Sequence, residues 1–236
     1  MWGFYEYVPV AKKKEKAAKV LVKLKKKNPD IRPVVIEGTK IAKTWWGGSW
    51  NKNLESYADY SNRIGRGRSY VRNGFVLDLQ IEAESVTAIV AGSGRTPYNV
   101  KINIAALPEA TWKKITELCG RSIANIDQLV QGKFPKELEM LFTQHDGGLF
   151  PSPKEIKFSC SCPDWAYMCK HVAAVLYGVG ARFDEDPTLF FKLRNIQIEA
   201  LIKKSIEEKM ENMLKNSGKT TRRVIKEADI GELFGV

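Results

Sequence analysis

Alternation between apolar and polar residues predicts an antiparallel sheet in the first half of the chain. Four strands are expected, at about 67–71, 75–82, 85–91 and 97–104. In the segment 75–82, every second residue is apolar, namely Phe75, Leu77, Leu79 and Ile81. Strands with this period bury one face and leave the other in water. We therefore expect a half-buried sheet that needs helices on its apolar side.

A turn at Arg72-Asn73-Gly74 is expected to join the first two strands. A three-residue loop with Gly74 in the left-handed conformation keeps the apolar residues on one face and sets Arg68 opposite Asp78. Basic and aromatic side chains then share the exposed face as candidate nucleic-acid contacts: Arg66, Arg68, Tyr70, Arg72 and Lys101. The alternative is a solvated face on which Arg68 only pairs with Asp78.

Apolar residues at helical spacing predict the remaining elements. One helix runs from Ser49 to Gly65, helices between 108 and 141 are expected to cover the sheet, and another helix follows residue 171. Residues 196–215 carry an amphipathic stripe that must dock on the body or on a partner helix. The predicted fold class is α+β, an antiparallel four-stranded sheet covered by helices, with helical basic ends.

Positive charge is concentrated near the N-terminus. The chain of 236 residues has a formal net charge of +11, and residues 11–27 hold nine lysines and one glutamate. An apolar stripe along this arm is formed by Ala17, Val20, Leu21 and Leu24. The arm either binds phosphates or an acidic partner, or only keeps the chain soluble. No stretch is long and apolar enough for a membrane span and no signal-peptide pattern is present, so we expect a cytoplasmic protein without a membrane partner.

Three cysteines and one histidine lie close together in the stretch CSCPDWAYMCKH, residues 160–171. Cys160 and Cys162 can reach one ion from an extended segment, because residues two apart in a strand share a face. Cys169 and His171 can join them only if Cys169 precedes a helix and His171 lies in its first turn. Three thiolates and one imidazole complete a tetrahedral Zn²⁺ shell without an open position, which indicates a structural metal.

Other uses of these four residues fit the spacing less well. A disulfide between Cys160 and Cys162 would be strained and would leave an odd cysteine nearby. A nucleophile pair of Cys169 and His171 has a spacing that suits convergence on an ion better than a mutual hydrogen bond. An iron–sulfur cluster usually takes four thiolates. Cys119, near the end of a predicted helix, is expected to be a small buried residue and not a ligand.

The pattern C-x-C-x6-C-x-H, followed by VAAVLY, closely resembles the SWIM zinc finger, a module named for Swi/Snf-type helicases and plant Mutator transposases. WWGGSW at 45–50, RGRSYVRNG at 66–74 and VAGSGRTPYNVKI at 90–102 resemble bacterial SWIM-finger proteins that often accompany a Swi/Snf-type ATPase. The resemblance spans roughly residues 44–195. It implies nucleic-acid or protein binding and no established reaction.

These observations divide the chain into four parts: a basic arm at 1–30, an α+β domain at 31–150, the zinc finger at 151–195, and an amphipathic helix with a tail at 196–236. The predicted function is a zinc-binding, non-enzymatic interaction module for nucleic acid, DNA rather than RNA, acting with a Swi/Snf-type DNA-dependent ATPase. The alternative is a protein–protein adaptor without nucleic-acid binding. A nuclease would need clustered carboxylates, and the nearest set, Asp78, Glu82 and Glu84, is too spread out.

Overall fold

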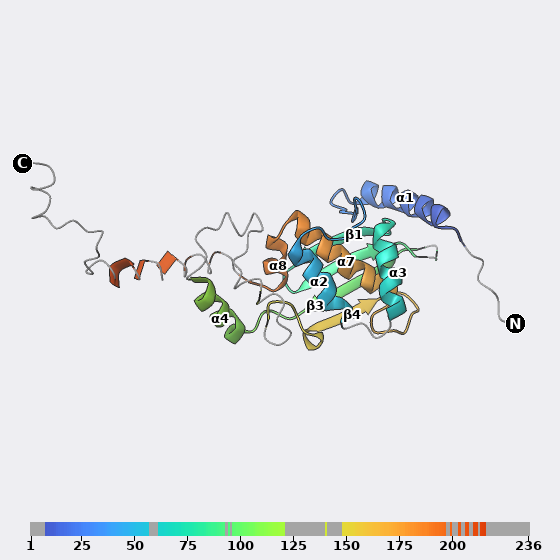
Figure 1. The fold of residues 1–236 in the computed structure, drawn as a ribbon. Helices are drawn as coiled ribbons and strands as arrows, with labels where there is room; N and C mark the ends of the chain where they lie inside the picture. Colours follow the sequence, from blue (N-terminus) through green and yellow to red (C-terminus); the bar gives the residue numbers. More distant parts are fainter. Residues whose placement is uncertain are drawn as a thin grey trace, which may run out of the picture.

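A four-stranded antiparallel sheet forms the centre of the structure, a computed structural model. It describes residues 8–56, 61–92, 94, 96–120, 140 and 148–196, and scattered residues at 199, 203, 206–207, 210–211 and 213–215. The strands follow the order β1-β2-β3-β4 (Figure 1). They span Val76–Glu82 (β1), Ser85–Val90 (β2), Tyr98–Ile104 (β3) and Ile156–Cys160 (β4). The α+β class and the strands predicted at 75–82, 85–91 and 97–104 are confirmed.

The described helices flank this sheet. They are α1 (Val10–Lys27), α2 (Trp45–Glu55), α3 (Ser61–Arg72), α4 (Glu109–Gly120), α7 (Lys170–Glu185) and α8 (Thr188–Leu193). No helix in the described part of the chain combines the length and apolar character that crossing a membrane requires.

Helix α7 lies on the inner face of the sheet and is surrounded by protein. Every residue from His171 to Ala181 is buried, as expected for a helix that is apolar on all sides. Helices α2 and α3 pack against α7 on the side away from the sheet, so the layers are the sheet, then α7, then α2 with α3 (Figure 1). Trp50 of α2 is fully buried, and its indole N–H donates to the carbonyl of Leu176 at 3.0 Å. The cover predicted from helices 108–141 is thus supplied by α7, whereas 121–139 and 141–147 lie outside the described residues.

The outer face of the sheet is covered at one corner by α1. Ala17 is buried there, in a small apolar cluster with Phe75 and Leu77. A β-bulge between Val76 and Asp78 shifts the register of β1 against β2. The bulge inserts one residue and reverses the alternation, so Phe75 and Leu77 face α1 whereas Leu79 joins the inner core. The prediction of one continuous apolar face from 75 to 81 is wrong for this reason.

The strand predicted at 67–71 is also wrong, because these residues belong to α3. Gly67 lies so close to α7 that a Cβ atom added there would sit 2.5 Å from the Cβ of Ala173. Glycine at this position therefore permits the close approach of two helices, and this tertiary packing overrides its low helix propensity.

The turn predicted at Arg72-Asn73-Gly74 ends α3 and is not a hairpin. The N–H of Gly74 donates to Val71 O at 3.0 Å, and the N–H of Phe75 donates to Tyr70 O at 3.1 Å. Gly74 has a φ of +70°. This is the Schellman arrangement of a helix C-terminus. The left-handed glycine is therefore present as predicted, but in a different structure.

The preceding helix is likewise shifted from its predicted position. Helix α2 begins at Trp45, where the Thr44 side chain accepts a hydrogen bond from the Gly47 N–H at 3.2 Å. Ser49 lies inside α2 and caps nothing, and Gly65 lies inside α3. Thr44 is therefore the N-cap that the sequence prediction missed.

The fourth strand is β4, from the segment predicted as the zinc finger. It pairs with β3 in the register Val100↔Cys160, Ile102↔Phe158 and Ile104↔Ile156. Together with α7, β4 contributes to the same core as the strands of the preceding segment. The segments 31–150 and 151–195 therefore share one hydrophobic core.

Candidate metal centre and the surfaces around it

Three cysteines and one histidine from different elements converge at one end of α7. Cys160 is the last residue of β4, Cys162 follows in a bend, Cys169 is the N-cap of α7, and His171 lies in its first turn. One ligand atom from each of the four lies within 4.8 Å of the others. The prediction that Cys169 precedes a helix and His171 lies in its first turn is confirmed.

The geometry of this cluster fits a tetrahedral metal ion. The Nδ1 atom of His171 is 3.9 Å from Sγ of Cys160 and 3.9 Å from Sγ of Cys169. A tetrahedral zinc shell with Zn–S of about 2.3 Å and Zn–N of about 2.0 Å has donor separations of about 3.5–3.8 Å. Small side-chain movements would therefore close the shell. The soft thiolate donors favour zinc over the hard cations magnesium and calcium.

The cysteines influence one another's protonation. The hydrogen bond from Cys160, aided by His171 and the backbone of Val172, lowers the pKa of the Cys169 thiol to about 4 although burial opposes this shift. The hydrogen bond with Cys169, together with burial, raises the pKa of Cys160. The pKa of Cys162 is also raised, mainly by burial. One sulfur is thus ionised first, and a metal that binds all three must displace the remaining thiol protons.

His171 is held between two tyrosine rings. Its ring centroid is 4.6 Å from that of Tyr98 and 5.4 Å from that of Tyr70. The side chain is only 1% exposed, and its Nε2 atom has no hydrogen-bond partner among the described residues. Burial raises the pKa of Tyr70, and the Lys170 ammonium lies 5.8 Å from its ring centroid. The packing therefore fixes the imidazole with Nδ1 directed at the thiols.

The structure does not bring the predicted nucleic-acid residues together on the sheet. Arg66, Arg68, Tyr70 and Arg72 lie on α3, and of the five predicted residues only Lys101 is on a strand. The predicted sheet-face placement of the four α3 residues is wrong, because it depended on the strand at 67–71. Their contact with nucleic acid remains a prediction, now for a helix surface.

Arg68 makes its polar contacts with residues of the neighbouring helices. Its guanidinium lies 2.6 Å from a Glu55 carboxylate oxygen and donates to the Tyr177 hydroxyl at 2.7 Å. The hydrogen bond to Glu55 raises the pKa of Arg68, and burial raises that of Tyr177. The predicted pair with Asp78 is wrong, since Asp78 accepts instead from the Arg32 backbone at 2.8 Å. Arg68 therefore ties α3 to α2 and α7.

The part of the outer sheet face beyond α1 is polar. Its exposed side chains from β2, β3 and the β4 segment are Thr87, Asn99, Lys101, Asn103, Lys157, Ser159 and Ser161. We call this set the outer strip. The sequence analysis missed its β4 half, although the alternation of Ile156, Phe158 and Cys160 with polar residues is itself a strand signal.

Comparison with known proteins supports the metal centre. Residues 151–179 match the SWIM zinc finger family. The chain is also 36% identical over 183 residues to the uncharacterized protein Rv2102 of Mycobacterium tuberculosis, in an alignment that covers 74% of this chain and 66% of that protein. No solved structure matches the chain significantly. With the four converging ligand residues, the match shows that residues 151–179 form a SWIM zinc finger, a binding module.

Proposed function

We propose that this protein binds nucleic acid, DNA rather than RNA, through the outer strip and the lysine face of α1, on a fold held together by one zinc ion. The observation that carries the proposal is the composition of the outer strip. Its charged members, Lys101 and Lys157, are cations, and the others are Asn, Ser and Thr. The neighbouring acidic residue on this face is Glu82 of β1, which pairs with Lys192 at 2.7 Å. Such side chains supply most protein contacts to phosphate and sugar.

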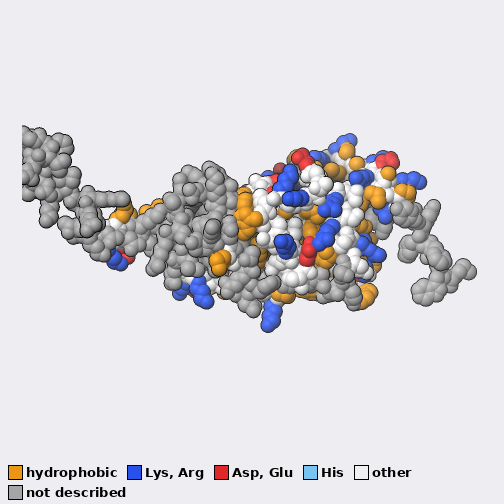
Figure 2. All heavy atoms as spheres, in the orientation of Figure 1, with side chains coloured by type: hydrophobic (Ala, Val, Ile, Leu, Met, Phe, Trp, Pro, Cys, Tyr) orange, Lys and Arg blue, Asp and Glu red, His pale blue; other side chains and the backbone are white. Residues whose placement is uncertain are grey.

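Helix α1 extends this positive surface. The polar strip begins beside the α1 contact, because Asn99 is the register partner of Ile89, which packs against the α1 cluster. The lysine-rich helix α1, with nine lysines and one glutamate in residues 11–27, therefore lies next to one end of the strip. Figure 2 shows the opposite side of the molecule, where Lys and Arg side chains are more widespread than Asp and Glu over α1, α2 and α3. Lysines on the strip and on α1 attract a polyanion through counterion release.

The zinc ion has a structural role in this proposal. Cys160, Cys162, Cys169 and His171 are the proposed ligands, and they join the end of β4 to the start of α7. Four protein donors leave no position for a water nucleophile, so the ion performs no chemistry. By fixing β4 on the sheet edge, the metal also fixes the β4 half of the outer strip. The protein is accordingly proposed to bind and not to catalyse.

A Swi/Snf-type ATPase remains the proposed protein partner, and the cytoplasm the proposed compartment. The ATPase rests on the sequence resemblance alone. It is secondary to nucleic-acid binding, which can be measured on the isolated chain.

The test is fluorescence anisotropy with labelled DNA between 50 and 200 mM salt. The double variant Lys101→Ala/Lys157→Ala removes two cations from the outer strip, and Lys40→Ala/Lys43→Ala removes two exposed cations from the loop before α2. We expect the strip variant to weaken binding and to lower the salt slope by about 0.7–0.9 for each phosphate that is no longer neutralised. The loop variant should bind as the unmodified protein does.

Two results would reject the proposal. One is the absence of measurable DNA binding at 150 mM salt, which would favour the protein–protein adaptor. The other is an equal effect of the two double variants, which would mean that net charge matters and the strip does not.

A further inference from the structure

The loop between the two pairs of zinc-finger ligands presents aromatic rings to solvent. Along residues 165–168, side chains alternate between exposed and buried positions. Trp165 is 81% exposed and Tyr167 is 54% exposed, whereas Ala166 and Met168 are buried in the core. Large exposed aromatic side chains at the tip of a structured loop are characteristic of binding surfaces.

The loop that carries these exposed rings is held in place by contacts with the rest of the protein. Asp164 pairs with Arg63 at 3.1 Å, with both side chains largely buried, and also accepts the Ala166 N–H at 3.3 Å. The Tyr167 hydroxyl donates to Ile156 O at 2.8 Å, and its ring centroid is 5.0 Å from that of Phe158. The proposed ligands Cys162 and Cys169 bracket the loop. Little conformational entropy would therefore be lost when a partner contacts Trp165.

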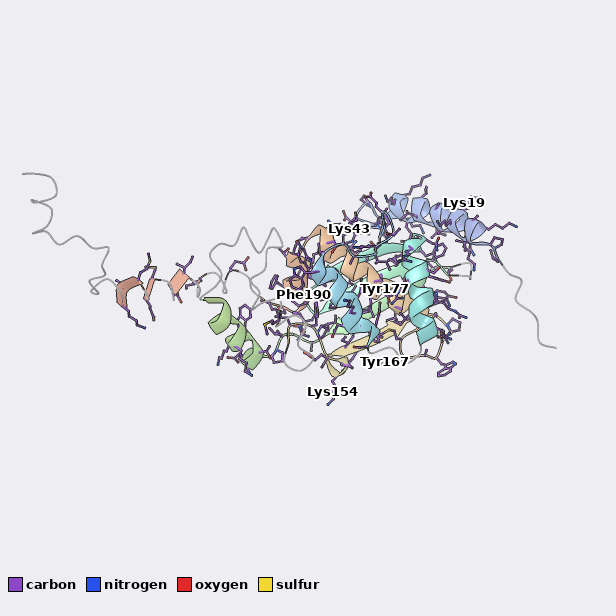
Figure 3. The ribbon with its side chains drawn as sticks, viewed as in Figure 1. Lys19, Lys43, Lys154, Tyr167, Tyr177 and Phe190 are labelled. Atoms are coloured by element: carbon purple, nitrogen blue, oxygen red, sulfur yellow. The ribbon has the colours of Figure 1, made fainter. Side chains whose placement is uncertain are left out.

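The charge around this loop favours an anionic partner. Lys154 and Lys157 are exposed on the segment that precedes the loop, and Tyr167 is bonded to Ile156 between them. Figure 3 shows Lys154 and Tyr167 on the same side of the molecule, at the β4 edge. The acidic residue of the loop, Asp164, is neutralised by Arg63. Aromatic rings beside exposed lysines are the combination that binds single-stranded nucleic acid.

We infer that Trp165, with Tyr167 beside it, stacks on unpaired bases, so that the preferred nucleic acid is single-stranded. This inference rests on the proposed function and specifies its substrate class. Bases in a duplex already stack on each other and present only their edges, whereas an unpaired base offers a face to a protruding ring. The outer strip supplies backbone contacts, and the finger loop supplies the preference for single strands.

The test compares three substitutions at Trp165 on a labelled single-stranded oligonucleotide and on a duplex of the same length, at one fixed salt concentration. Trp165→Ala removes the ring, Trp165→Leu keeps apolar bulk without a π face, and Trp165→Phe keeps a π face. Val35→Ala is the control, because Val35 is also apolar and 66% exposed but lies outside the finger. Zinc content and melting temperature show that each variant is folded.

We expect Trp165→Ala and Trp165→Leu to weaken single-strand binding by about 5- to 150-fold, the equivalent of 1–3 kcal/mol for one stacked base. Duplex binding should stay within twofold, and Trp165→Phe should retain most of the single-strand affinity. Unchanged single-strand affinity, or an equal loss on both DNAs, would overturn the stacking role. If the unmodified protein binds neither DNA, the proposed function itself has failed, which is a different result from binding without discrimination.

Discussion

The two faces of the sheet differ in how much of their surface is buried. The inner face meets α7, which is buried along most of its length and begins at the zinc-finger ligands. The outer face meets α1 only around Phe75 and Leu77, and its remainder is the polar outer strip. The proposed binding surface is thereby separated in space from the core that stabilises the fold. Substitutions on the inner face should destabilise the protein, and substitutions in the outer strip should change what it binds.

The largest expected effect comes from removing a metal ligand. The apparent binding free energy of a structural zinc ion is about 10–16 kcal/mol, similar to or above the stability of a typical domain, about 5–15 kcal/mol. Cys162→Ser should therefore release the metal, loosen the start of α7 and cause aggregation. Elemental analysis should find one zinc per chain in the unmodified protein and much less in this variant.

Cys119→Ser is the matched control for the ligand assignment. Cys119 lies in α4, away from the ligand sequence, so the zinc content of this variant should stay at one per chain. Full zinc occupancy after Cys162→Ser would show that the assigned shell is incorrect.

The zinc finger could be predicted from sequence because metal ligation is a local property. Four ligand residues with a fixed spacing restrict the backbone so strongly that Cys169 had to precede a helix, and it does. The helix α3 could not be predicted in this way. The alternation of Arg66, Arg68 and Tyr70 with Gly67, Ser69 and Val71 fits a strand, whereas the helix packs on α7 through contacts such as Gly67 with Ala173, more than 100 residues away.

The outer face shows the same limit on sequence prediction. The alternation in β1 predicts that Leu77 and Leu79 share a face, but the bulge separates them. A bulge depends on the partner strand, which the pattern of one strand does not contain. The docking of α1 was missed for a related reason, because its apolar stripe was visible but the matching patch appeared only after the bulge turned Phe75 and Leu77 outward.

The next largest effect contrasts neighbouring residues of β3 that lie on opposite faces. Ile102 is fully buried on the inner face, and Ile102→Ala should lower the free energy of unfolding by about 2–5 kcal/mol. Lys101 is exposed on the outer strip, and Lys101→Ala should change stability by less than about 0.5 kcal/mol while reducing DNA affinity. Chemical denaturation and DNA titration of both variants measure the difference. A stability loss of similar size in both would remove the distinction between the faces.

A smaller effect is expected from undocking α1. Ala17 is 4% exposed against the sheet, whereas Ala18 is exposed. Ala17→Lys and Ala18→Lys add the same charge, but only the first places a lysine in the apolar contact. Ala17→Lys should cost about 1–3 kcal/mol of stability, since Ala17 is buried but its α1 neighbours Val20, Leu21 and Leu24 are only partly buried. Thermal melting of the two variants distinguishes the loss of α1 packing from the effect of the added charge. Equal melting temperatures for Ala17→Lys and Ala18→Lys would mean that α1 contributes no packing energy.

The smallest effect concerns Arg68, which the sequence assigns to nucleic-acid binding and the structure places beside Glu55 and Tyr177. The side chains of Arg68 and Glu55 are 43% and 30% exposed, so solvent screens the ion pair and Arg68→Ala should reduce stability by no more than about 1 kcal/mol. Because the guanidinium is already paired, the salt slope of DNA binding should not change. Arg66→Ala is the appropriate comparison, since Arg66 is exposed on the same helix. If Arg68→Ala lowers the salt slope as much as Lys101→Ala does, the guanidinium must leave Glu55 to contact phosphate, and the helical layer would then belong to the binding surface together with the outer strip.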